Sequence, residues 1–260
     1  MKKRILVVGD GCEDIYIYGK CERLCPDAPV PVLIPTKKII NGGMAKNVYE
    51  NIKSIYLYVD LITNKNLISK TRFVHERTNQ MFVRVDEGGH LAERVNIQDI
   101  NLNNYELIVL ADYCKGFLRE EDIEYICANH KNVFLDTKKI LGSYCQQARI
   151  IKINEVEYNR NVEAKIDLSK FHNSLITTLG DKGCRYENIL YGVDVVEIKD
   201  MTGAGDTFMA CLVVKYLQTD NIETAITFAN ECATTVVQHK GVVKIGDHFK
   251  LGSLLVDFEK

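Results

Sequence analysis

Short runs of β-forming residues separated by helical segments constrain the fold of this chain more than any other feature. The runs are residues 107–110, 133–135, 150–153 and 174–178. Helical stretches fall between several of them, for example 120–128. Strands that alternate with helices in this way form parallel sheets with both faces covered. The sequence therefore predicts an α/β fold with a central, mostly parallel sheet, and 260 residues suit one domain over 1–260.

The first part of the chain predicts extended structure of another kind. Residues 5–8 are apolar and lead into Gly9-Asp10-Gly11, which indicates a buried strand that meets a turn. All four prolines fall within residues 16–35, which excludes a helix there and favours edge strands. Asn41-Gly42-Gly43 predicts a turn before a helix over 45–52.

A hairpin is predicted further along. Segments 72–75 and 80–85 alternate in the manner of strands and are separated by four polar residues. Because the flanks are polar, we expect the hairpin to stand off the main sheet as a small β lid, with lid strands within 12–40 and 70–90. A small β excursion over 185–196 and two closing helices, over 204–216 and 223–238, complete the predicted elements.

Composition excludes several functional classes. The chain carries 33 basic and 35 acidic side chains, a net charge of -2, so neither a nucleic-acid partner nor a membrane surface is expected. No apolar run reaches transmembrane length, and the N-terminal run is too short for a signal peptide. The nine cysteines are odd in number and include no Cys-x-x-Cys, which indicates free thiols in a reducing cytoplasm rather than a metal site at Cys21 and Cys25.

The strongest chemical motif is Thr202-Gly203-Ala204-Gly205-Asp206, directly before an apolar helix. Glycines and a helix N-terminus expose backbone N–H groups, which together form an anion hole for a phosphate. A carboxylate beside such a hole can take a proton from an attacking hydroxyl. The alternative is structural, with Asp206 as a capping or first-turn acid.

Asn154 and Glu157 follow the strand predicted over 150–153. Three residues apart at the start of a helix, they could hold a hydrated Mg²⁺ near phosphates. The alternative is a capping box, in which each side chain bonds the other residue's backbone N–H.

Near the N-terminus, Asp14, Asn47 and the pair Gly42-Gly43 offer polar groups and close approach to a hydroxyl-rich ligand. The structural alternative makes the glycines a turn and Asp14 an exposed acid.

Residues 200–207 resemble the C-terminal signature of the ribokinase-like (PfkB) carbohydrate kinases almost residue for residue. The resemblance implies a ribokinase-like fold, with ATP and Mg²⁺ as cofactors and Asp206 as the catalytic base beside the anion hole of Gly203, Ala204 and Gly205. It implies Mg²⁺ near Glu157, with contact through water. The nucleotide residues that it implies are Asn154, Glu157, Thr178, Gly180, Gly183, Thr202, Asn230 and Gly241, and the sugar residues are Asp14, Gly42, Gly43 and Asn47.

Further strings are similar to the heptose-7-phosphate kinase branch of this family. They are residues 23–32, 78–86, 110–116 and 135–138. This implies D-glycero-D-manno-heptose 7-phosphate as the acceptor, phosphorylated at O1, with Lys115 and Lys138 on phosphate and arginines 72, 77 and 84 as candidate clamps. One departure concerns the sugar side, where the chain reaches the hairpin too soon after residue 62 and lacks one βα unit of the family.

Alternatives remain open at this point: a ribose- or fructose-type kinase of the same family, or a catalytically idle binding protein on its fold. An NAD-binding oxidoreductase is disfavoured, because Asp14 stands where Gly-x-Gly-x-x-Gly needs its third glycine. We expect a small-molecule sugar or sugar phosphate as ligand, a homodimer formed through lid strands, and no second catalytic activity.

Overall fold

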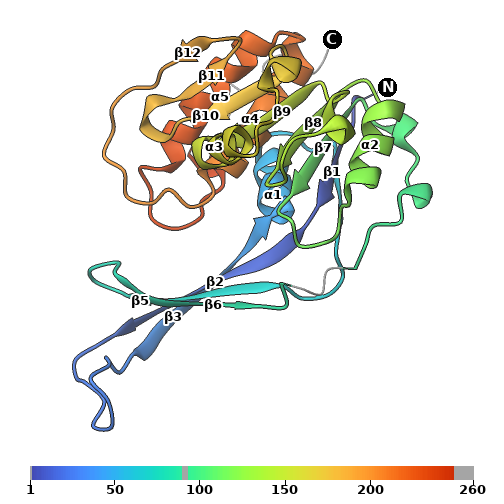
Figure 1. Ribbon diagram of the computed structural model, residues 1–260. Coiled ribbons are helices and arrows are strands. Elements are labelled where there is room, and N and C mark those ends of the chain that lie inside the picture. The colour runs from blue at the N-terminus through green and yellow to red at the C-terminus, as the bar shows by residue number, and fades with distance from the viewer. Residues whose placement is uncertain (1, 90–92, 249–260) are drawn as a thin grey trace.

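The computed structural model describes residues 2–89 and 93–248, and its centre is an eight-stranded sheet (Figure 1). The strand order is β12-β11-β10-β9-β8-β7-β1-β4. The strands are β1 (Ile5–Gly9), β4 (Val59–Thr63), β7 (Leu107–Asp112), β8 (Val133–Thr137), β9 (Ile150–Asn154), β10 (Leu175–Thr178), β11 (Cys184–Tyr186) and β12 (Ile189–Tyr191). All neighbours from β4 to β10 are parallel, and only the β11 and β12 pairings are antiparallel. The predicted ribokinase-like α/β arrangement, with a mostly parallel sheet, is confirmed.

Helices cover both faces of this sheet. They are α1 (Ala45–Ile55), α2 (Glu120–Asn129), α3 (Glu155–Glu163), α4 (Ala204–Thr219) and α5 (Ile222–Val236). Successive strand side chains point to opposite faces, so Ile5 and Val7 pack in one core with α1, α4 and α5. Leu6 and Val8 pack in the other core, with α2 and with Tyr158 of α3. Burial on both faces explains why the strands are continuous apolar runs rather than alternating ones.

Short 3-10 turns connect several of these elements. They span Ile97–Asp99, Leu102–Asn104, Ser143–Cys145, Leu168–Phe171, Gly180–Lys182 and Ile245–Asp247.

A second, four-stranded sheet extends from the body in the order β3-β2-β5-β6 (Figure 1). Its strands are β2 (Gly11–Lys20), β3 (Ile34–Met44), β5 (Ser69–His75) and β6 (Met81–Glu87). We call it the small sheet. The predicted hairpin is confirmed, because β5 and β6 pair antiparallel. Of the range 70–90 expected to hold lid strands, position 90 lies outside the described residues.

The predicted turn at Asn41-Gly42-Gly43 is wrong. These residues belong to β3, and Gly43 pairs with Cys12 of β2. The physical reason is close approach rather than turning: a Cβ atom on Gly43 would lie 2.3 Å from Asp14 Oδ2. The chain bends one residue later, at Met44, whose φ is 58°.

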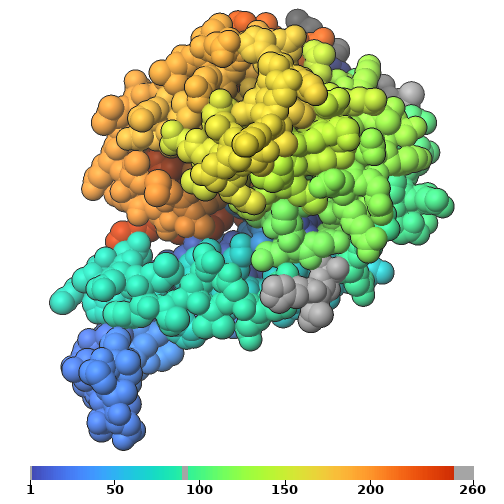
Figure 2. Space-filling view, in the orientation of Figure 1, coloured from blue at the N-terminus to red at the C-terminus, as the bar shows by residue number. Residues whose placement is uncertain are grey.

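The large sheet ends at β4, and β5 of the small sheet begins only six residues after β4. Within residues 2–89 and 93–248, no strand pairs with the outer edge of β4. This agrees with the expected lack of one βα unit beside the small sheet. In the space-filling view, the surface is hollowed between the small sheet and the body (Figure 2).

All nine cysteines lie within the described residues and are free thiols. None of the described helices is both long enough and apolar enough to span a bilayer.

Candidate active site

The carboxyl ends of the parallel strands meet the N-terminus of α4 at one edge of the large sheet, where Asp206 lies in the first helical turn. Gly203 precedes the helix with φ 82°, a left-handed conformation that glycine adopts without strain. The first N–H groups of a helix have no partners within it. The predicted hole of Gly203, Ala204 and Gly205 is only partly formed, because the Ala204 N–H donates to the Met201 carbonyl at 3.2 Å. Gly205 and Asp206, the second and third residues of α4, present their amides at this edge.

Asp206 does not cap its own helix. Its side chain is 8% exposed and bonds to other elements of the fold. Asn47 of α1 donates its Nδ2 to Asp206 Oδ2 at 2.7 Å, and the Tyr113 hydroxyl donates to Oδ1. Of the structural alternative, the capping role is therefore wrong, whereas Asp206 is indeed an acid in the first turn of the helix.

Burial raises the pKa of Asp206 above its ordinary value. The hydrogen bonds from Tyr113 and Asn47 act against this rise, the nearby Asp136 carboxylate adds to it, and Lys152 opposes it. A carboxyl group with a raised pKa is a better proton acceptor, which suits the predicted role of a base.

Lys152 and Asp136 form an ion pair that sequence reasoning missed. They are register partners on β9 and β8, and Lys152 Nζ lies 2.6 Å from Asp136 Oδ2, with both side chains 7% exposed. Burial alone would lower the pKa of Lys152, but the carboxylate of Asp136 raises it, so the ammonium group stays charged. A Cβ atom on Gly205 would lie 3.1 Å from Lys152 Nζ, so this cation sits against the glycine loop. The signal was a lysine inside an otherwise apolar strand.

Asn154 and Glu157 form the capping box that was the alternative interpretation. Asn154 Oδ1 accepts from the Glu157 N–H, and Glu157 Oε2 accepts from the Asn154 N–H, both at 2.8 Å. Lys138 Nζ also donates to Glu157 Oε1 at 3.1 Å. Glu157 is therefore buried and held at the carboxyl end of β9, next to the edge where Asp206 lies.

Three of the residues predicted for the nucleotide lie at the end of β10 and in the turn after it. Thr178 ends β10, and its hydroxyl donates to the Ile153 carbonyl at 3.4 Å. Gly180 and Gly183 flank the following turn with φ of 64° and 85°. A Cβ atom on Gly180 would meet nothing within 4 Å, so this turn faces open space.

The other three nucleotide residues have protein partners. The Thr202 and Gly241 N–H groups donate to the two carboxylate oxygens of Asp200, at 2.9 and 3.0 Å, which ties their two loops together. Asn230 is buried and donates its Nδ2 to the Tyr191 carbonyl at 2.9 Å. This amide group joins α5 to β12 rather than facing open space.

On the sugar side, Asp14 is buried. The structural alternative, which made Asp14 an exposed acid, is therefore wrong. Arg72 NH1 lies 2.5 Å from Asp14 Oδ1 and its guanidinium lies over the Tyr16 ring. Gly42 packs against Glu50 of α1, where a Cβ atom would come within 2.8 Å of Oε1. Arg84 pairs with its neighbour Asp86, so neither Arg72 nor Arg84 is a free clamp.

Lysines gather between the small sheet and the body. Lys70 Nζ and Lys138 Nζ lie 5.9 and 4.9 Å from the centroid of the Tyr113 ring. Lys115 Nζ would lie 3.3 Å from a Cβ atom on Gly89. Tyr113 was missed as a site residue, although it stands within residues 110–116, which resemble a family string.

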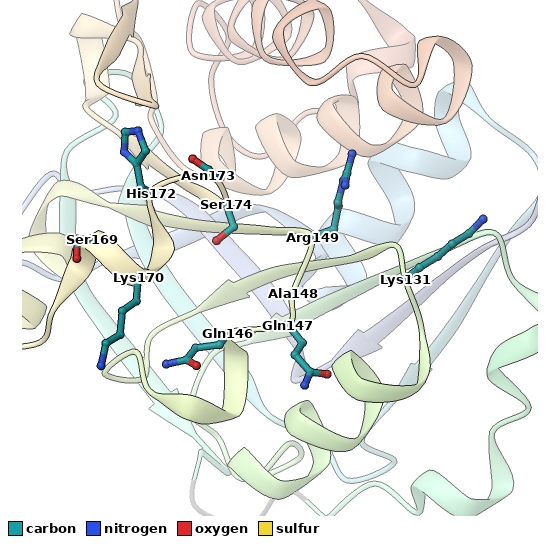
Figure 3. Close-up of a pocket in the computed structure, with 10 residues that line it drawn as sticks. All are labelled: Lys131, Gln146, Gln147, Ala148, Arg149, Ser169, Lys170, His172, Asn173 and Ser174. Carbon is teal, nitrogen blue, oxygen red and sulfur yellow. The ribbon is translucent and has the colours of Figure 1, made fainter.

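A cavity of about 400 Å³ lies away from this site (Figure 3). Its lining residues precede strands β8, β9 and β10, so it opens at the amino edge of the large sheet. Four of them are basic or histidine: Lys131, Arg149, Lys170 and His172. Figure 3 shows these side chains pointing in different directions rather than toward one point, which does not favour a ligand site.

The sequence model of the pfkB family carbohydrate kinases matches residues 57–246 of the chain. The chain belongs to the pfkB family of carbohydrate kinases. The family is described as carbohydrate kinases, enzymes whose phosphoryl acceptor is a sugar. The matched region includes Tyr113, Asn154, Glu157 and Asp206.

Relatives and solved structures agree with this family. The bifunctional protein HldE of Helicobacter pylori strain J99 is 31% identical, over 92% of this chain and 64% of that protein. The chain thus spans somewhat less than two thirds of the relative's length. A ribokinase of Thermotoga maritima superimposes with a TM-score of 0.71 at 16% identity, covering 98% and 100% of the two chains. An Arabidopsis thaliana ribokinase, solved with ribose and ATP, gives 0.66 at 15% identity over 98% of each chain.

Proposed function

We propose that this chain transfers the γ-phosphoryl group of ATP to a hydroxyl group of a sugar phosphate, with Asp206 as the general base. The observation that carries the proposal is the position of Asp206. It is buried at the start of α4, beside the Gly205 amide, with a raised pKa and two neutral donors on its oxygens.

ATP would supply the phosphoryl group, and the residues around it would do the rest by position and charge. Asp206 accepts the proton of the acceptor hydroxyl while that oxygen bonds to phosphorus and the bond to the ADP oxygen breaks. The Gly205 and Asp206 amides donate to the phosphoryl oxygens, as helix N-termini do toward anions. Lys152, against Gly205, adds a fixed positive charge to this loop.

The nucleotide would lie over the carboxyl ends of β9 and β10. The open side of Gly180 leaves room for it, and Thr178 and Gly183 lie at either end of the same turn. Thr202 and Gly241 would contribute from the two loops that Asp200 ties together. Asn154 and Glu157 lie where a hydrated Mg²⁺ could bridge to phosphates. Within the described residues no group of three or more metal-ligating side chains exists, which favours contact through water over a direct protein cage.

We further propose that the acceptor already carries a phosphate group, as in D-glycero-D-manno-heptose 7-phosphate, and that O1 is phosphorylated. The support is chemical: Lys70, Lys115 and Lys138 line the space between Asp206 and the small sheet, and ammonium groups suit a phosphate. Asp14 and Asn47 would receive the sugar hydroxyls. The 31% identity to bifunctional HldE proteins is consistent with a heptose acceptor.

An acceptor panel tests this proposal. The purified protein is incubated with ATP, Mg²⁺ and heptose 7-phosphate, fructose, fructose 6-phosphate or ribose, and ADP release is followed. We expect kcat/KM to be at least tenfold higher for heptose 7-phosphate than for any unphosphorylated sugar. Preference for ribose or fructose would contradict the acceptor assignment. ATP binding without turnover of any acceptor would contradict the kinase reaction itself and favour an idle binding protein.

A further inference from the structure

The backbone at Tyr113 is fixed by a buried carboxylate. Asp10 is fully buried, and it accepts hydrogen bonds from the N–H groups of Tyr113, Lys115 and Phe117 at 2.7, 3.2 and 3.2 Å. This clamp holds the loop that follows β7 in one conformation. Three hydrogen bonds therefore tie the segment that carries Tyr113 to Asp10, at the end of β1.

The Tyr113 hydroxyl reaches Asp206. It donates to Oδ1, while Asn47 donates to Oδ2. Each oxygen of the carboxylate thus has one neutral donor, from different elements, and the plane of the carboxylate is fixed between them. Donors to an ionised carboxylate stabilise its charged form over the protonated one.

We propose that Tyr113 is a positioning residue for phosphoryl transfer, holding the Asp206 carboxylate charged and turned toward the acceptor hydroxyl. The role rests on the proposed function, since it acts through the base. Without this donor, the buried Asp206 carboxylate would keep the Asn47 hydrogen bond and the nearby charge of Lys152.

The charged groups around the two residues keep the phenol protonated. Tyr113 is faced by Asp206 from α4, Asp136 from β8 and Glu157 from α3, and burial together with these carboxylates raises the pKa of Tyr113 well above its ordinary value. Lys70 of β5 and Lys138 lie over the ring face. The hydroxyl therefore stays a donor throughout the pH range in which a kinase can be assayed.

The test compares Tyr113→Phe with the parent in two measurements. The first is the pH profile of kcat/KM for the acceptor, and the second is the titration of Asp206 by carbon-13 NMR of aspartate carboxyl groups without any substrate. Asp206→Asn identifies the signal. Tyr144→Phe is the matched control, because Tyr144 is a tyrosine buried in the other core, which contains Leu6 and Val8.

The sign follows from the hydrogen bond. Tyr113 lowers the pKa of Asp206, so its removal raises that pKa and the base stays protonated to higher pH. A hydrogen bond to a charged group corresponds to a shift on the order of one pH unit. We expect the acid limb of the profile to move upward by about that amount, with about tenfold lower activity at its low-pH end. The NMR titration should move by the same amount, while KM for ATP and the Tyr144→Phe profile stay unchanged.

The outcomes separate this inference from the proposed function. If the pH profile and the NMR titration of Tyr113→Phe superimpose on those of the parent, the proposed role of Tyr113 is wrong. The proposed kinase reaction is not affected by that result. A parent that turns over no acceptor overturns the proposed function, and the NMR titration then decides alone whether Tyr113 holds the carboxylate.

Discussion

At the scale of single residues, buried charges concentrate beneath the glycine loop that begins α4. Asp136 and Lys152 form a pair there with both side chains 7% exposed, and Asp206 lies close enough to affect the pKa of both its neighbours, Tyr113 and Lys152. A buried charge is tolerated where a partner and hydrogen bonds compensate the lost hydration. The arrangement places one fixed cation and two carboxylates where a phosphoryl group would be transferred.

Lys152→Met tests how strongly the pair holds this region. The change leaves Asp136 buried and without its cation, so we expect a loss of about 3–5 kcal/mol in the free energy of unfolding. Urea unfolding followed by circular dichroism measures it. Lys131→Met is the control, because Lys131 is exposed and its Nζ lies 3.9 Å from Glu106 Oε1 in a surface ion pair. Loss of this pair should change the free energy of unfolding by about 0.5 kcal/mol or less. A loss no larger than that of the control would contradict this account of the pair.

Sequence reasoning found some of these residues and missed others for a physical reason. Gly203, Gly205 and Asp206 are close neighbours in the sequence, so the sequence alone shows that they lie together. Lys152 and Tyr113 become neighbours of Asp206 only through the register of β8 and β9 and through the Asp10 clamp. Such contacts depend on tertiary packing, which no local pattern contains.

At the scale of elements, the small sheet has two different faces. The strand register forms one row across the sheet, from β3 to β6. The row consists of Ile40, Ile15, Thr71 and Val85. Phe73 and Val83 pair in the next row, on the same face. Ile40, Val83 and Val85 are 53%, 51% and 40% exposed, so this face is apolar and uncovered by the described residues. The opposite face carries Asp14, Tyr16 and Arg72 toward the body.

We propose that a second copy of this chain covers the apolar face. A single Val83→Lys substitution would place a charge in that interface, so we expect the parent to sediment as a dimer and the variant as a monomer. Sedimentation velocity makes the measurement. Leu57→Lys serves as the control, because Leu57 is 76% exposed on the body and not on the small sheet. A monomeric parent, or a Val83→Lys variant that remains dimeric, would contradict the proposal.

The elements also show where sequence patterns lose information. The hairpin of β5 and β6 alternates clearly and was predicted. In β3 the pattern is hidden, because the pair Gly42-Gly43 suggests a turn. These glycines serve close packing against Asp14 and Glu50 instead, a cause that appears only once β2, β3 and α1 are together.

At the scale of the whole molecule, one site is assembled from distant parts of the chain. Asp14 and Arg72 come from the small sheet, Asn47 from α1, Tyr113 from the loop after β7, and Asp206 from α4. The parallel sheet brings them together, because the carboxyl ends of its strands share one edge. The alternation of apolar runs and helices predicted that sheet, whereas the shortened connection between β4 and β5 departs from the family pattern on the acceptor side.

The central claim is that Asp206 is the base of phosphoryl transfer in this chain, and one paired measurement on Asp206→Asn tests it most directly. ADP release with the best acceptor gives turnover, and calorimetric titration with ATP and Mg²⁺ gives nucleotide affinity. An amide cannot accept the proton, so we predict that kcat falls at least by the roughly 10²–10⁴-fold typical of general-base loss, with Kd for ATP within about twofold of the parent. Turnover near that of the parent would contradict the claim.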